Sequence, residues 1–122
     1  MLRIRESQYR VLEAYQRRRF AKETAEHLLR DFPEKCGKLG LDAGNVVAFT
    51  EKGLDRARNL YELICSDDLR FFAECTVMLH PEFDLNDNVP WACTIMSDDS
   101  LTGSEKIAQI DESLLFEGTE PL

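Results

Sequence analysis

The chain contains no long hydrophobic run, no paired-cysteine motif and only two histidines. Its longest uninterrupted apolar stretches are a few residues, whereas a membrane-spanning helix needs about 20. The opening MLRIRESQYR carries charges where a secretory signal would need its apolar segment. We therefore expect a cytoplasmic protein that does not enter a membrane. At 122 residues, the chain suffices for one hydrophobic core, which predicts one helical domain over residues 1–116 and a flexible tail at 117–122.

The four cysteines, Cys36, Cys65, Cys75 and Cys93, are not spaced as a metal-binding or redox motif. No two of them form C-x-x-C, and no histidine stands at a zinc-finger interval from a pair. In a reducing compartment they should remain thiols. Because Cys65, Cys75 and Cys93 lie among apolar neighbours, we expect them to be free and buried. The sequence thus indicates no metal and no cofactor.

Basic residues are scarce and unevenly placed. Fifteen Lys and Arg stand against twenty-three Asp and Glu, giving a net charge of −8. Residues 1–35 carry +3 and residues 36–122 carry −11. An acidic chain is a poor general binder of nucleic acid, whose phosphates require a positive surface. The asymmetry favours a protein partner of complementary charge, although a net charge of this size also serves solubility alone.

The spacing of apolar residues is helical almost throughout, and no stretch alternates with the period of a strand. The pattern from Ile4 to Phe32 fits one long helix or two collinear ones, closed by Pro33 and the glycine at 37. Further helices are predicted over 46–60, over 69–79 with Ser66 as cap, over 90–96, and from a Ser104 cap to 115. These elements predict an all-α fold, a compact bundle of five or six helices.

No group of residues forms a convincing catalytic or metal site. His80 with Glu82 and Asp84 could supply a general base, but no activated nucleophile or phosphate-binding loop accompanies it. The segment 84–88 fails as an EF-hand, because Val89 occupies the position that requires glycine and Ile95 the one that requires glutamate. We therefore expect no enzymatic activity.

Six residues are candidates for contact with a partner protein. The triplet Arg17-Arg18-Arg19 is the only basic cluster and could dock on an acidic surface, although such a triplet is often a solvated helix face. Phe83 and Trp91 concentrate aromatic area near Asp84 and could line an apolar groove. The candidate partner-binding set is Arg17, Arg18, Arg19, Phe83, Asp84 and Trp91.

Four short patterns mark helix ends and packing positions along the chain. They are Phe32-Pro33, Gly53-Leu54 with Ala57, Leu79-x-Pro81 with Phe83-Asp84, and Pro90-Trp91. Together, over about residues 2 to 115, they resemble small all-helical accessory proteins encoded in type VI secretion effector modules of Gram-negative bacteria. The chain departs from that family at Leu60-Tyr61-Glu62, where many members have Tyr-Gly.

The resemblance implies an accessory role rather than a reaction. In that role the protein would be a co-chaperone or adaptor that binds an effector, its chaperone or both before loading on the secretion spike. The alternative is an immunity protein that covers the active site of a cognate toxin. Small size, acidity and an all-α fold suit that alternative, because many toxins that degrade nucleic acid are basic.

Overall fold

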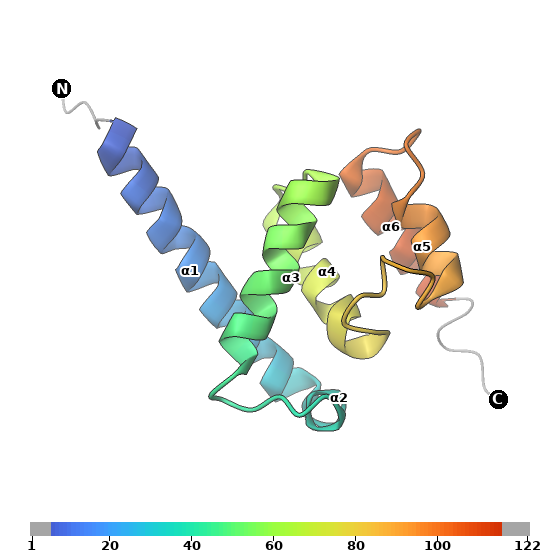
Figure 1. Cartoon of the computed structure of the whole chain (residues 1–122), viewed down its shortest axis with the longest axis horizontal. Helices are drawn as coiled ribbons and strands as arrows, with labels where there is room; N and C mark the ends of the chain where they lie inside the picture. The colour runs from blue at the N-terminus through green and yellow to red at the C-terminus, as the bar shows by residue number, and fades with distance from the viewer. Residues whose placement is uncertain (1–5, 116–122) are drawn as a thin grey trace. The chain divides into compact units, whose positions relative to one another are not determined.

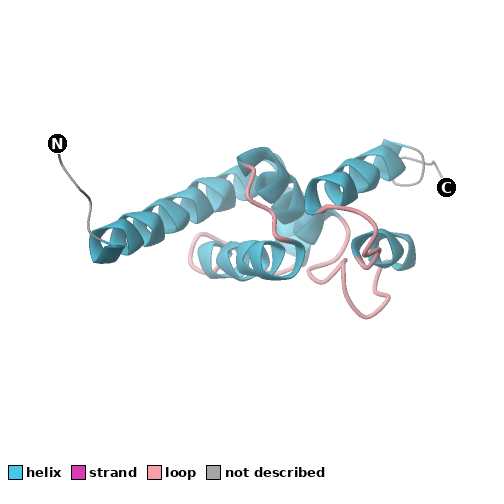
Figure 2. Cartoon of the chain, turned by 90° about the horizontal axis from the view of Figure 1, so that it is seen from above, coloured by secondary structure: helices cyan, strands magenta, loops and turns pink. Residues whose placement is uncertain are grey.

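The protein is built from helices joined by loops (Figures 1 and 2). The computed structural model describes the backbone of residues 6–115 and the side chains of residues 13–115. Within residues 6–115 there are six helices and no strand, which confirms the all-α prediction. No helix in this range is long and apolar enough to cross a membrane. The helices are α1 (Glu6–Asp31), α2 (Pro33–Lys38), α3 (Val46–Tyr61), α4 (Ser66–Met78), α5 (Pro90–Met96) and α6 (Gly103–Ser113).

The chain divides into two compact units. Unit 1 is Met1–Glu51 and unit 2 is Lys52–Leu122, so the boundary falls within the sequence of α3. The single domain expected over residues 1–116 stays a prediction, and the expected tail at 117–122 lies outside the described residues.

In unit 1, residues 6–31 form one continuous helix, which decides between the two alternatives that the sequence left open. Ala21, Thr24, Ala25 and Leu28 are buried at helical spacing along α1. The prediction that the first helix ends at Pro33 is confirmed, but a further short helix that was not predicted begins there. Pro33 occupies the first turn of the short helix α2, where its fixed φ and missing N–H are tolerated. α2 packs against α1, and Cys36 donates from its thiol to the carbonyl oxygen of Leu28 over 3.4 Å.

In unit 2, α4 supplies more buried side chains than any other helix. Its buried residues are Leu69, Phe72, Ala73, Cys75, Thr76 and Val77. The first turn carries Asp67 and Asp68, and carboxylates there interact favourably with the helix dipole. The capping position, however, is Cys65 rather than Ser66, and its side chain makes no capping hydrogen bond. α4 packs against α6, and α6 packs against α5.

The start of α6 also differs from the sequence prediction. Thr102, not Ser104, is the cap: its hydroxyl accepts from the Glu105 N–H, and the Glu105 carboxylate accepts from the Thr102 N–H. These reciprocal hydrogen bonds form a capping box, and they lower the pKa of Glu105. Ser104 instead donates to the Asp68 carboxylate over 2.7 Å and so joins α6 to α4. The predicted bounds of α5, Pro90 to Met96, are confirmed.

All four cysteines are free thiols, but their burial differs from the prediction. Cys75 is buried as expected, whereas Cys93 is only half-buried and Cys65 is exposed. Cys36, whose burial was not predicted, is also buried. Burial raises the pKa values of the Cys36 and Cys75 thiols.

Candidate interaction surface and buried ion-pair cluster

The arginine triplet lies on α1 in unit 1, and all three side chains are exposed. Arg17 pairs with Glu13 over 2.8 Å and Arg19 with Glu23 over 3.1 Å, each one helical turn away. Among residues 13–115, Arg18 makes no ion pair. Two charges of the triplet are therefore neutralised by ion pairs, and the third faces solvent. This arrangement is compatible with both a solvated helix face and a docking patch.

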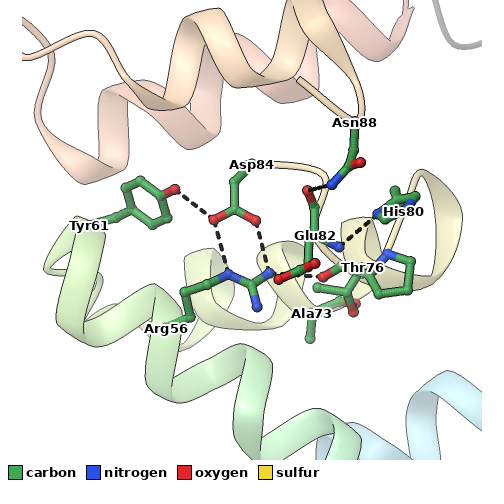
Figure 3. A network of polar contacts seen from close by, with 9 residues as sticks. Arg56, Tyr61, Ala73, Thr76, His80, Glu82, Asp84 and Asn88 are labelled. Carbon is green, nitrogen blue, oxygen red and sulfur yellow. Dashed lines mark hydrogen bonds and ion pairs between the residues drawn. The ribbon is translucent and has the colours of Figure 1, made fainter. Parts of the chain in front are cut away.

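Asp84 in unit 2 lies in the interior, at the centre of a polar cluster (Figure 3). Its carboxylate accepts from Arg56 Nε over 3.0 Å and from Arg56 Nη2 over 2.8 Å, a bidentate pair. It also accepts from the Tyr61 hydroxyl over 2.6 Å. The Asp84 side chain is 0% exposed and that of Arg56 13%. A buried carboxylate is tolerated only when its charge is matched and its oxygens are hydrogen-bonded, and this cluster meets both conditions.

The turn after α4 carries Asp84 into the cluster. Phe83 donates its N–H to the carbonyl oxygen of His80 over 2.9 Å, and the Glu82 N–H donates to His80 Nδ1 over 3.0 Å. Arg56 Nη2 donates to the carbonyl oxygen of Pro81 over 2.9 Å and so binds the turn's backbone as well as its carboxylate. Arg56 thereby fixes this turn against α3.

A second turn follows directly and leads toward α5. The Asn88 N–H donates to the Leu85 carbonyl oxygen over 3.1 Å, and the two central residues, Asn86 and Asp87, both have φ near +55°. Asn and Asp tolerate this left-handed conformation better than other non-glycine residues. The Asn88 amide donates to the Glu82 carbonyl oxygen over 3.1 Å. The segment that resembled a calcium loop is therefore a tight turn.

Aromatic rings surround the ion pair. The Phe72 ring lies 4.9 Å from the Phe83 ring and 5.8 Å from the Tyr61 ring, centroid to centroid. The Arg56 guanidinium lies 5.4 Å from the Phe72 centroid, and the Lys106 ammonium lies 5.3 Å from that of Tyr61. Burial, and then the hydrogen bond to Asp84, raise the pKa of Tyr61 well above its usual value.

The residues of the possible general-base group are engaged elsewhere. His80 Nδ1 accepts the Glu82 amide, and both carboxylate oxygens of Asp84 are bound by Arg56 and Tyr61. The Glu82 side chain is exposed. The Asp84 carboxylate is enclosed by its own chain and presents no oxygen to a substrate. Its contacts are therefore structural. Among residues 13–115, no cluster of His, Cys, Asp or Glu could hold a metal ion.

The aromatic candidates fall into two classes. Phe83 is 0% exposed, so the expected groove does not present its side chain at the surface. Trp91, in the first turn of α5, is half-buried and keeps part of its ring accessible. Among the six candidates, the structure therefore leaves Trp91 and the three arginines at the surface, and encloses Phe83 and Asp84.

The surface of unit 2 is strongly acidic. Between residues 52 and 115, ten carboxylates are exposed but only two basic side chains, Lys52 and Arg70. Arg56 and Lys106 lie inside, and Arg58 is largely covered. The exposed carboxylates belong to Asp55, Glu62, Asp67, Glu82, Asp87, Asp98, Asp99, Glu105, Asp111 and Glu112.

Sequence reasoning missed Arg56 and Tyr61. Arg56 stands between Leu54 and Ala57, both fully buried, and an arginine in such a position signals a buried acceptor. The fold and the cluster define an all-α protein whose second unit is organised around a buried arginine–aspartate pair. Comparison with models of protein families, with curated proteins and with solved structures finds no match for this chain.

Proposed function

We propose that the protein is a non-catalytic accessory factor that binds another protein through the acidic surface of unit 2. The observation that carries the proposal is the separation of charge in this unit: its cations lie mostly inside and ten carboxylates lie outside. A surface of one sign accelerates association with a partner of the opposite sign and disfavours nucleic acid. The partner is therefore a protein with a basic face.

The resemblance in the helix-end motifs supplies the setting. In it, the protein acts in the cytoplasm of a Gram-negative bacterium as a co-chaperone or adaptor. Its partner is a type VI effector or the chaperone of that effector, which it binds before the effector is loaded on the spike. The half-buried Trp91 is the apolar candidate in this contact.

Co-expression and pull-down with the effector and the chaperone encoded beside it test the proposal. Binding should weaken as salt rises from about 50 mM to about 500 mM, because salt screens exposed charges. The double variant Asp99→Lys with Glu112→Lys reverses two exposed charges of unit 2 and should abolish capture.

The matched control makes the same change of charge in unit 1. Glu26 and Glu34 are exposed there, and the double variant Glu26→Lys with Glu34→Lys should leave capture intact. Failure to form a complex with either folded partner would contradict the proposal, and so would equal loss in both double variants.

The acidic surface also favours a second candidate, an immunity protein for a basic toxin. Such a protein must protect cells that express the toxin, whereas an adaptor need not. Survival of toxin-expressing cells with and without this chain separates the two. If the immunity function holds, protection should be lost with Asp99→Lys and Glu112→Lys and kept with Glu26→Lys and Glu34→Lys.

A further inference from the structure

The junction between α3 and α4 in unit 2 exposes apolar side chains that its own unit leaves uncovered. We define the α3–α4 junction as residues 60–67. Leu60 is 56% exposed and Ile64 is 91% exposed, and the neighbouring Cys65 is exposed as well. Single exposed apolar residues are common on protein surfaces, but three within six residues give a local concentration of apolar surface that a partner could cover.

Carboxylates border this stretch. Glu62 and Asp67 are exposed within the junction, and Glu105 is exposed on α6, whose first residue contacts it. The nearest exposed cation along the chain is Arg70, which lies 3.8 Å from Asp67. The junction therefore fits an occupant that presents an apolar side chain beside a positive charge.

The chain itself contains such a segment. Residues 14–19 of α1 are all exposed, and six consecutive helical residues cover the whole circumference of a helix. This segment therefore packs no face against the rest of unit 1. It presents Tyr15, 62% exposed, next to Arg17, Arg18 and Arg19.

We propose that the protein associates with itself, residues 14–19 of one copy docking on the α3–α4 junction of a second copy. Tyr15 covers Ile64 and Leu60, and Arg18, which has no ion-pair partner among residues 13–115, meets Glu62. Because every copy carries both surfaces, the proposed arrangement is reciprocal, and two such contacts join the same two copies as a dimer. This contact is separate from the binding of a different protein and does not depend on it.

Sedimentation equilibrium of the full chain, over roughly a hundredfold range of concentration, measures the association. We expect dimers whose dissociation constant rises between about 50 mM and about 500 mM salt. Ile64→Asp places a charge at a fully accessible position and should raise that constant at least about tenfold. Leu115→Asp, at a side chain 68% exposed elsewhere in unit 2, is the matched control and should not change it.

Charge reversal tests the pairing itself. Arg18→Glu and Glu62→Arg should each raise the dissociation constant, and the double variant should recover most of the loss, because it restores opposite charges across the contact. Circular dichroism confirms that each variant keeps its helices. A monomer at every concentration would overturn the proposal. So would a dimer that Ile64→Asp leaves intact, or equal weakening by Leu115→Asp.

Discussion

The two units use charge differently. In unit 1, α1 carries ion pairs between residues close in sequence, such as Glu13 with Arg17 and Arg19 with Glu23. Unit 2 has pairs of the same local kind, but it also encloses a long-range pair. In unit 2, Arg56 and Asp84 are 28 residues apart in sequence and both are removed from solvent. Exposed pairs within a helix contribute a few tenths of a kcal/mol. A buried pair, by contrast, ties distant elements together and is costly to break.

The buried side chains of α1 and of unit 2 also differ in kind. The buried part of α1 consists of small and aliphatic side chains, Ala21, Thr24, Ala25 and Leu28. Unit 2 encloses three aromatic rings around its ion pair: Tyr61, Phe72 and Phe83. Unit 2 therefore contains interactions between residues far apart in sequence. The described part of α1 relies on local ion pairs and on burial of a helix face, as amphipathic helices generally do.

The largest expected effect comes from removing the buried carboxylate. Asp84→Ala leaves the Arg56 guanidinium without its counter-charge and should lower the free energy of unfolding by about 3–5 kcal/mol. Urea denaturation followed by the fluorescence of Trp91, the only tryptophan, reports on unit 2. The control, Glu23→Ala, removes an exposed pair from unit 1 and should cost less than about 0.5 kcal/mol. Equal losses of unfolding free energy in the two variants would contradict the difference between the buried and the exposed ion pairs.

Close packing at the start of α6 gives the next effect. A Cβ at Gly103 would overlap the carbonyl oxygen of Tyr61 and lie 2.8 Å from Leu63 Cδ2. Gly103→Ala should therefore destabilise unit 2 by about 1–3 kcal/mol in the same urea experiment.

Gly53 is the matched position for Gly103. A Cβ there would meet Thr76 Cγ2 at an ordinary 3.6 Å. Gly53→Ala should stabilise α3 by about 0.5–1 kcal/mol, because alanine has the higher helix propensity. A loss of stability at Gly53 as large as that at Gly103 would contradict the packing described.

Alkaline pH should weaken unit 2 through Tyr61. The fold favours the neutral phenol, so its pKa is raised above the ordinary 10.0. This contribution is complete below pH 10. Above pH 10 it declines by up to about 1.4 kcal/mol per pH unit, because the unfolded chain releases the phenolic proton and the folded chain does not.

Tyr61→Phe has no phenolic proton and is the matched variant. Its urea midpoint should fall less steeply than that of the parent above pH 10. The buried thiols of Cys36 and Cys75, whose pKa values are raised above the ordinary 9.0, cause a decline that begins near pH 9 and is common to both proteins. Parallel pH profiles for parent and Tyr61→Phe would show that folding does not raise the pKa of Tyr61.

The smallest effect should be a gain. Glu62 ends α3 with φ at +55°, a left-handed conformation that favours glycine. Glu62→Gly should raise the free energy of unfolding by about 1 kcal/mol. Glu62→Ala, which keeps a Cβ, should bring no such gain. The same gain in both variants would indicate that the carboxylate, rather than the backbone, is responsible.

Local chemistry made much of the helical layout predictable. Pro90 begins α5 and the apolar spacing from Val46 onward marks α3, because proline and periodicity act within a few residues. The left-handed conformation at Glu62 was not predicted. The short helix that begins at Pro33 was not predicted. The Thr102 cap was missed because the nearby Ser104 is equally suitable as a capping residue.

The candidate site was harder to predict. Phe83 and Asp84 were recognised as notable, but their burial depends on Arg56, Tyr61 and Phe72 from two other elements. No local rule connects residues so distant in sequence. The charge asymmetry, by contrast, was visible in the composition, and it persists at the surface of unit 2, where ten carboxylates but only two cations are exposed between residues 52 and 115.

The central claim is that Asp84 and Arg56 act together inside the fold. A double-mutant cycle with Arg56→Met, Asp84→Leu and the combined variant, measured by urea denaturation, tests it most directly. The account predicts a coupling energy of at least about 2 kcal/mol, with the combined variant more stable than either single variant because no buried charge is left unpaired. Additive losses, with a coupling energy below about 0.5 kcal/mol, would contradict it.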